Sequence, residues 1–152
     1  MPEAVRTMVT FRSSVFNKTE TKPYFLNPYC FGDDVCRWFI TRLRSQAVAT
    51  DDEPGQEDFG WYFNFQLGDD TYCFVLGFRP DDEGEDGSWL GFLERSVGLI
   101  GSLLGRRSRG IPVEAARAIH GALSNASEIT EVRWHTKKDF DARAEELGVK
   151  EP

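Results

Sequence analysis

The sequence predicts a single α+β domain, residues 1–152, built on a mainly antiparallel five-stranded sheet with helices packed chiefly on one face. The length of 152 residues is the common size of one domain. Residues 59–78 contain two runs in which aromatic and polar residues alternate, which is typical of a β-hairpin covered on one side. Other segments repeat apolar residues every three to four positions, as amphipathic helices do. The expected order is β-α-β-β-β-α-β-α.

The first strand is predicted over residues 5–15, where β-branched and aromatic residues alternate with polar ones. A loop over residues 17–32 follows. Asp33 or Asp34 can accept hydrogen bonds at the start of the first helix, and Arg42 and Arg44 suit the negative end of its dipole. The apolar stripe of this helix consists of Val35, Trp38, Phe39 and Leu43.

Residues 49–58 form an acidic segment that is predicted to be a loop. The two strands of the hairpin come next, joined by a turn at Gly68-Asp69-Asp70. Their apolar positions are Phe59, Trp61, Phe63, Phe65 and Leu67 on the first strand, and Tyr72, Phe74, Leu76 and Phe78 on the second. Because this stripe has the period of a strand, it predicts one wall of a core.

The second half of the chain is predicted to add two strands and two helices. A strand over 89–95 follows the acidic loop 80–87, and a strand over 129–135 separates the helices. Pro112 suits the start of one helix. Thr136 and Asp139 resemble a capping box for the last helix, in which Phe140, Ala144 and Leu147 are expected to face inward. For residues 97–110 the sequence does not choose between helix and loop.

Charge is unevenly distributed along the chain. Residues 1–88 hold 16 acidic and 8 basic residues, whereas residues 89–152 hold 9 and 10, within a total net charge of −7. Such a balance disfavours nucleic acid as a partner and makes a basic protein partner electrostatically easier, although an acidic surface also serves solubility alone.

Three cysteines, Cys30, Cys36 and Cys73, without a C-x-x-C motif predict reduced thiols and a cytoplasmic protein. The N-terminal residues lack the basic start and apolar run of a signal peptide. No apolar stretch approaches the 18 residues or so that a membrane span requires.

Several short motifs resemble those of a group of small, uncharacterised bacterial proteins. Glu57-Asp58-Phe59-Gly60-Trp61 is similar to the Glu-Asp-Trp-Gly-Trp motif of that group, with Phe59 in place of a Trp. Proteins of that group also have counterparts of three other segments: the strand containing Arg12-Ser13-Ser14, the Asn27-Pro28 loop, and the segment from Trp134 to Phe140. The resemblance implies a similar fold in a bacterial cytoplasm, and it brings no function with it.

One candidate site lies at the start of the hairpin. Glu57 and Asp58 are adjacent carboxylates beside Trp61, and such a pair near aromatic rings can hold a cation or supply an acid and a base. The alternative is that the carboxylates cap the strand or pair with an arginine, because no third catalytic group accompanies them.

A second candidate lies before the helix at Pro112. Arg106, Arg107 and Arg109 precede the free N–H groups of its first turn, which suits a phosphate or carboxylate. The preceding glycines lack the spacing and the lysine of a P-loop, so a solvated basic loop is the alternative. The apolar segment 97–105 is a candidate for docking on an anionic membrane or in a partner groove, or for self-association, giving a homo-oligomer. The alternative is a mobile loop or a short helix that covers one end of the sheet.

No cofactor or metal motif is present in the sequence, and neither His120 nor His135 has zinc-ligand spacing. The sequence therefore predicts a binding module rather than an enzyme, with a protein as its partner, and the acidic charge makes a basic protein one candidate. The alternative is a small-molecule or anion-binding protein, or a weakly marked enzyme, whose pocket lies between the sheet and residues 97–112.

Overall fold

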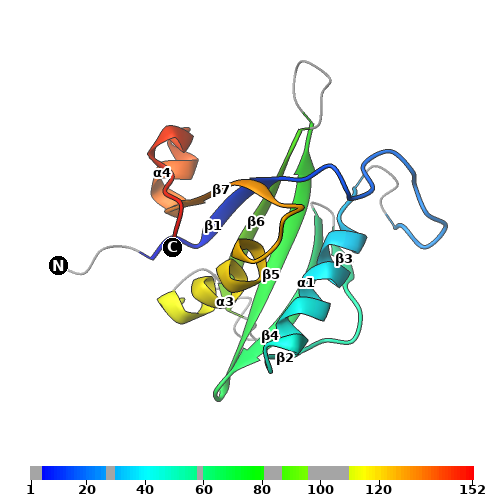
Figure 1. Cartoon of the computed structure of the whole chain (residues 1–152), viewed down its shortest axis with the longest axis horizontal. Coiled ribbons are helices and arrows are strands. Elements are labelled where there is room, and N and C mark those ends of the chain that lie inside the picture. Colours follow the sequence, from blue (N-terminus) through cyan, green and yellow to red (C-terminus); the bar gives the residue numbers. More distant parts are fainter. Residues whose placement is uncertain (1–4, 27–29, 58–59, 81–86, 96–109) are drawn as a thin grey trace.

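The computed structural model describes residues 5–26, 30–57, 60–80, 87–95 and 110–152. Its described part is an antiparallel sheet flanked by helices, as the α+β prediction requires (Figure 1). The strands are β1 (Met8–Arg12), β2 (Ala49–Thr50), β3 (Gly55–Glu57), β4 (Gly60–Leu67), β5 (Asp70–Arg79), β6 (Ser88–Arg95) and β7 (Thr130–His135). The helices are α1 (Asp33–Ser45), α3 (Val113–Ser124), α4 (Lys137–Asp141) and the 3₁₀ turn η1 (Glu145–Leu147).

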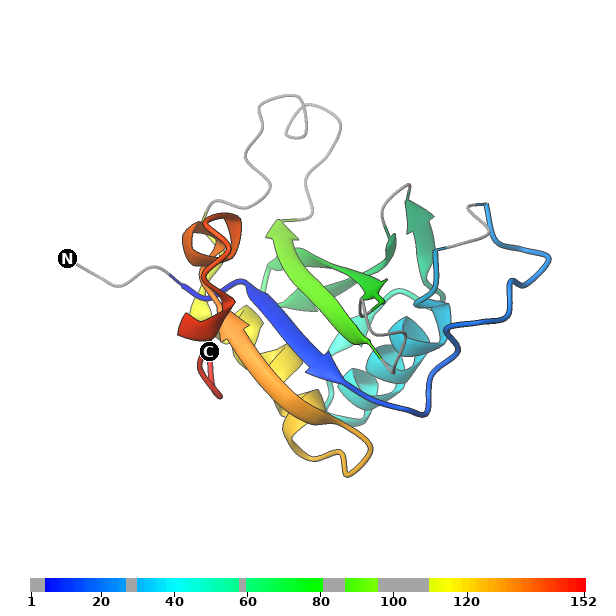
Figure 2. The same ribbon diagram turned by 90° about the horizontal axis from the view of Figure 1, so that it is seen from above.

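The strand order is β2-β4-β5-β6-β1-β7, and β3 pairs with the same edge of β4 as β2 does. The three central strands form a meander, with Phe63 opposite Phe74 and Phe74 opposite Leu93. The N-terminal strand β1 lies between β6 and β7 (Figure 2). A strand near the start of the chain is therefore paired with β7, a strand near its end.

Helices α1 and α3 lie side by side on one face of the sheet, as Figures 1 and 2 both show. The rings between helix and sheet are closely packed: the centroid of Phe39 is 5.1 Å from that of Phe74 and 6.1 Å from that of Phe11. Burying each such ring stabilises the fold by roughly 2–3 kcal/mol relative to exposure. The predicted aromatic stripe of the hairpin is therefore one wall of the core.

The opposite side of the sheet, which we call the open face, carries the alternate residues of each strand. On β1 these include Thr10 and Arg12, and on β7 they include Arg133 and His135. η1 lies over this face near the end of β7, where a methyl group at Gly148 would come within 2.7 Å of Nδ1 of His135. The open face is therefore polar at this end of the sheet.

The predicted count of five strands is wrong, because two further strands lie in the segment predicted to be an acidic loop. β2 and β3 have two and three residues, too few to show any alternation. They form because the outer edge of β4 has unpaired backbone groups, which β2 pairs at Phe65 and Gln66 and β3 pairs from Gly60 to Tyr62. Between them the side chain of Asp51 accepts the N–H of Asn64 at 2.9 Å.

The predictions for the chain ends also need correction. The first strand is limited to Met8–Arg12, and Val15, expected on its apolar side, is 61% exposed. The last helix is two short pieces, because Arg143 has a φ of 61°, outside the helical region. Consequently Leu147, expected to face inward, is 56% exposed. The cap predicted at Thr136 is confirmed, since its hydroxyl accepts the N–H of Asp139.

Among the residues that the structure describes, no helix has both the length and the apolar character needed to cross a membrane.

Candidate functional site

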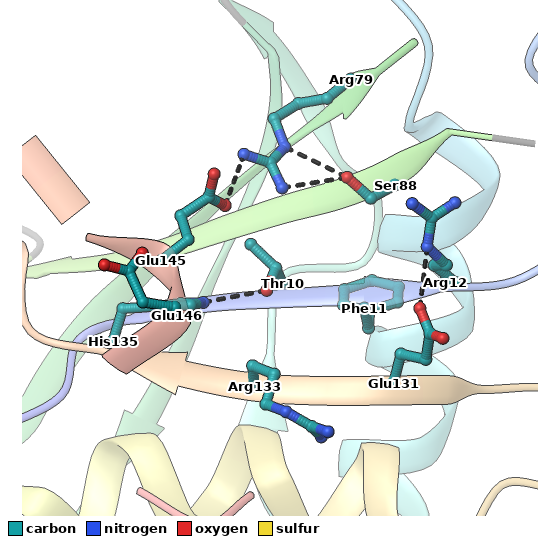
Figure 3. Close-up of a pocket in the computed structure, with 10 residues that line it drawn as sticks. All are labelled: Thr10, Phe11, Arg12, Arg79, Ser88, Glu131, Arg133, His135, Glu145 and Glu146. Carbon is teal, nitrogen blue, oxygen red and sulfur yellow. Dashed lines mark hydrogen bonds and ion pairs between the residues drawn. The ribbon is translucent and has the colours of Figure 1, made fainter. Parts of the chain in front are cut away.

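A pocket of about 450 Å³ lies on the open face, above β5, β6, β1 and β7 and beside η1 (Figure 3). Its volume is within the range of known ligand sites, roughly 300–1,000 Å³. Charged and polar side chains dominate its lining, which consists of Thr10, Phe11, Arg12, Arg79, Ser88, Glu131, Arg133, His135, Glu145 and Glu146.

The floor of this pocket is made of buried polar side chains. Thr10 is 8% exposed, Ser88 9% and His135 2%. These are three of the six buried polar residues in the described part of the chain. Because burying a polar group is costly without a partner, these side chains are paired within the pocket, Thr10 with His135 and Ser88 with Arg79.

Arg79 lies at the upper side of the pocket in Figure 3. Its Nε and one Nη each donate to the hydroxyl of Ser88, at 3.2 and 3.0 Å, and its other Nη contacts Glu145 at 2.8 Å. Three of its five N–H groups are thereby occupied. Since the oxygen of Ser88 accepts both bonds, its own proton remains available to donate to a ligand.

Arg12 and Arg133 come from β1 and β7. The Nε of Arg12 pairs with Glu131 at 2.9 Å, and its Nη donates to the carbonyl of Gly87. Arg133 donates to the carbonyl of Val132 at 2.8 Å, and within the described residues it makes no ion pair. Three arginines from three different strands, Arg12, Arg79 and Arg133, therefore line the pocket together with Thr10 (Figure 3).

Irregular backbone at this edge of the sheet directs these side chains. The register between β1 and β7 shifts between Thr10 and Arg12, and such an irregularity re-aims a side chain. On β7, Glu131 has a φ of 53°, a strained value for a non-glycine residue. The two irregular positions face one another and bring Arg12 and Glu131 into contact.

His135 is held in the floor as a neutral group. Its Nε2 lies 2.9 Å from Oγ1 of Thr10, and burial lowers the pKa of its imidazole. Within the described residues Nδ1 has no hydrogen-bond partner. A catalytic hydroxyl–imidazole pair requires a third group on that second nitrogen to orient the base. In the described part of the chain, Thr10 and His135 have no such third group.

The site predicted at the hairpin is divided between the two faces of the sheet. Trp61 is 4% exposed and packs against Phe25, at 5.1 Å between ring centroids. Its indole N–H donates to the carbonyl of Cys30 at 2.8 Å. Trp61 therefore holds the loop before α1 against the sheet, which is a structural role.

Glu57 lies on the side of the sheet opposite Trp61. It pairs with Gly60 while Gln56 pairs with Trp61, so their side chains alternate in direction. Burial of Tyr62, together with the nearby carboxylate of Glu57, raises the pKa of the tyrosine hydroxyl. Asp58, the other carboxylate of this predicted site, lies outside the described residues.

The predicted basic site cannot be placed, because Arg106, Arg107, Arg109 and the apolar segment 97–105 all lie outside the described residues. Their nearest described neighbour on that side is Gly110, whose carbonyl accepts two bonds from Arg95. Arg95 pairs with Tyr72, whereas Trp61 pairs with Leu76 further along β5. Tyr72 and Leu76 are four residues apart on β5, and four residues of a strand span about 13 Å. Gly110, which contacts Arg95, is therefore not close to Glu57, which lies near Trp61.

The acidic segment 49–58 is largely occupied by internal contacts. Glu53 pairs with Arg37 at 3.0 Å, and Asp52 pairs with Arg44 at 2.6 Å, both arginines being on α1. The side chain of Asp51 caps Asn64 on β4. Three of the five acidic side chains in this segment therefore hold it against α1 or β4.

Metal chemistry has no support in the described ranges, where no group of three or more His, Cys, Asp or Glu side chains is arranged to hold a metal ion. Cys30, Cys36 and Cys73 form no disulfide bond with one another. Cys36 is fully buried, and its burial raises the pKa of its thiol well above the ordinary value.

The sequence contains one local sign of the pocket. Thr10 and Arg12 are polar alternate residues of β1, and Glu131, Arg133 and His135 are polar alternate residues of β7. Each set alone resembles an ordinary solvated strand face. Only the pairing of β1 with β7 brings the two sets together.

The comparisons with known proteins do not add to this geometry. The resemblance to a group of small bacterial proteins, based on Glu57–Trp61 and the other short motifs, stays a prediction. The character of the site therefore follows from the arginines, hydroxyls and buried imidazole of the pocket itself. No protein-family model, no curated protein and no solved structure matches this chain.

Proposed function

We propose that the protein is a non-catalytic binding protein whose open-face pocket holds the carboxylate or phosphate group of a small molecule. The observation that carries this proposal is that Arg12, Arg79 and Arg133 line one pocket together with the buried hydroxyls of Thr10 and Ser88. Planar guanidinium groups bind carboxylate and phosphate oxygens in a bidentate way.

Arg133, Arg79 and Ser88 make different contacts with the ligand. Arg133, which makes no ion pair in the described structure, supplies the main charge, and Arg79 contributes the N–H groups not directed at Ser88 and Glu145. The hydroxyl of Ser88 donates to a ligand oxygen. Since Arg79 is fixed by Ser88 and Glu145 before a ligand arrives, little side-chain entropy is lost on binding.

A basic protein partner is the alternative function, and the net charge of −7 favours it. The pairing of Asp52 and Glu53 with arginines of α1 reduces the acidic surface available for such a partner. The two functions differ in the residues they require, because a basic partner would not depend on Arg79 or Arg133. For either function, three cysteines that form no disulfide with one another, and the resemblance, support a bacterial cytoplasm.

Calorimetric titration with phosphate, acetate, citrate and a nucleoside monophosphate tests the proposal directly. We expect at least one of these acids to bind saturably and to raise the melting temperature by mass action. Arg133→Gln should weaken that binding by about 10- to 100-fold, the loss of a charged hydrogen bond. Arg44→Gln, on α1, is the control and should bind as the wild type does.

Two outcomes would overturn the proposal. One is that none of the acids binds at millimolar concentration. The other is that Arg133→Gln and Arg44→Gln lower the affinity equally, which would indicate a general charge effect rather than the pocket.

A further inference from the structure

The charges around the pocket are balanced in number but not in pairing. Three arginines face three glutamates, and two pairs are closed: Arg12 with Glu131 at 2.9 Å and Arg79 with Glu145 at 2.8 Å. The third cation is Arg133. The third anion, Glu146, forms no ion pair with it or with any other residue in the described part of the chain.

Arg133 and Glu146 belong to different elements at this end of the sheet. Glu146 is on η1 and its side chain lies near His135, at the left of Figure 3, whereas the guanidinium of Arg133 lies below β1. Neither charge is satisfied inside the protein, and both line the same cavity. The pocket therefore presents one unpaired positive and one unpaired negative group to whatever occupies it.

A purely anionic ligand would satisfy Arg133 but would be repelled by Glu146 and Glu145. A purely cationic ligand would meet the opposite problem with the three arginines. A ligand that carries both charges would satisfy both unpaired groups and leave the two closed pairs intact. Complementary charges at both ends of a ligand also fix its orientation, which gives specificity.

We propose that the ligand is a small zwitterion of the α-amino-acid class, with its carboxylate on Arg133 and its ammonium on Glu146. This inference rests on the proposed function, because it requires that the pocket binds an acidic group. Ser88 and Thr10 line the same pocket and provide hydroxyls for the polar atoms of the ligand. A pocket of about 450 Å³ accommodates a single amino acid.

The test compares amino acids with the same acids lacking the ammonium group. The probe pairs are L-glutamate and glutarate, L-leucine and 4-methylpentanoate, and L-phenylalanine and 3-phenylpropanoate, titrated calorimetrically into the full chain. We expect one amino acid to bind at least about tenfold more tightly than its desamino partner, the effect of one charged hydrogen bond.

Two variants separate the inference from the proposed function. Glu146→Gln keeps the shape of the side chain, and it should weaken the amino acid at least tenfold while leaving the desamino acid unchanged or slightly improved. Arg133→Gln should weaken both. Glu57→Gln, on β3 far from the pocket, is the matched control and should change neither.

The inference is overturned if the desamino acids bind as tightly as the amino acids, or if Glu146→Gln weakens both equally. In those cases the proposed function stands, because an acidic group still binds. If no carboxylic acid binds at all, with or without an ammonium group, both the inference and the proposed function fail.

Discussion

Oγ1 of Thr10 lies 2.9 Å from Nε2 of His135, although 125 residues separate the two in the chain. This contact connects β1 to the end of β7 beneath the pocket. It also leaves the second nitrogen of the imidazole without a partner in the described structure. The hydrogen bond to Thr10 therefore offsets part of the free-energy cost of burying the imidazole of His135.

Replacing Thr10 with valine should lower the free energy of unfolding by about 1–3 kcal/mol, because it leaves Nε2 of a buried imidazole unsatisfied. Thr41→Val is the control, since the Thr41 hydroxyl bonds to the backbone of α1 at an exposed position. That variant should change stability by less than about 0.5 kcal/mol. Urea denaturation followed by circular dichroism measures both, and equal losses would contradict the importance of the Thr10 contact.

Stability should fall as the pH drops below about 6.5, the ordinary pKa of histidine. Burial lowers the pKa of both His120 and His135, so protons bind the unfolded chain more readily than the folded one. The free energy of unfolding therefore rises with pH through the interval between the folded and unfolded pKa values and is flat above it. Around His135 the charged groups are Arg79, Arg133, Asp139 and Glu145.

Melting temperatures of the wild type and His135→Gln between pH 5 and 8 test this dependence. The variant should show a smaller decrease from pH 7 to pH 5, although its stability at pH 7 is lower. Parallel curves for the two proteins would show that His135 does not contribute.

Trp61→Phe should destabilise the fold by about 1–3 kcal/mol, because it removes the hydrogen bond to the carbonyl of Cys30 and part of a buried ring. Affinity for any ligand of the open-face pocket should not change. Glu57→Gln should alter neither stability, beyond about 0.5 kcal/mol, nor affinity. Loss of binding in either variant, at temperatures where the protein is folded, would indicate that the ligand binds at the start of the hairpin and not in the open-face pocket.

Replacing each of two glycines with alanine should change the stability of the fold in opposite directions. Gly91 faces the core on β6, where an added methyl group would overlap the ring of Phe74, so Gly91→Ala should cost about 1–3 kcal/mol. Gly121 is within α3, and its nearest neighbour is the flexible end of Gln46 at 3.4 Å. There alanine should stabilise by about 0.5–1 kcal/mol through helix propensity. Chemical denaturation of the two variants decides the signs.

How far the sequence predicts this fold depends on the range of the interactions involved. The hairpin of β4 and β5 was predicted because nine apolar side chains recur at every second position of its two runs, within one continuous segment. α1 was predicted because its apolar spacing and its charged ends agree. β2 and β3 could not be recognised, since they are defined by the unpaired edge of β4 and not by their own residues.

The site was harder to predict than the fold for the same reason. Arg79, Thr10 and Arg133 are dispersed across the chain, and no spacing relates them. Trp61 attracted attention because of its neighbours in sequence, yet its side chain is directed to the opposite face from Glu57. A motif search finds residues that are close along the chain, whereas this pocket is assembled by strand order.

The position of β1 between β6 and β7 has a consequence for synthesis of the protein. Thr10 leaves the ribosome early, but its partners Leu90 and Arg133 are translated much later. At about 5–20 residues per second, β1 waits for several seconds with both edges unpaired. During this interval the meander of β4, β5 and β6 can collapse alone, and the nascent chain acquires its pocket only when β7 docks beside β1.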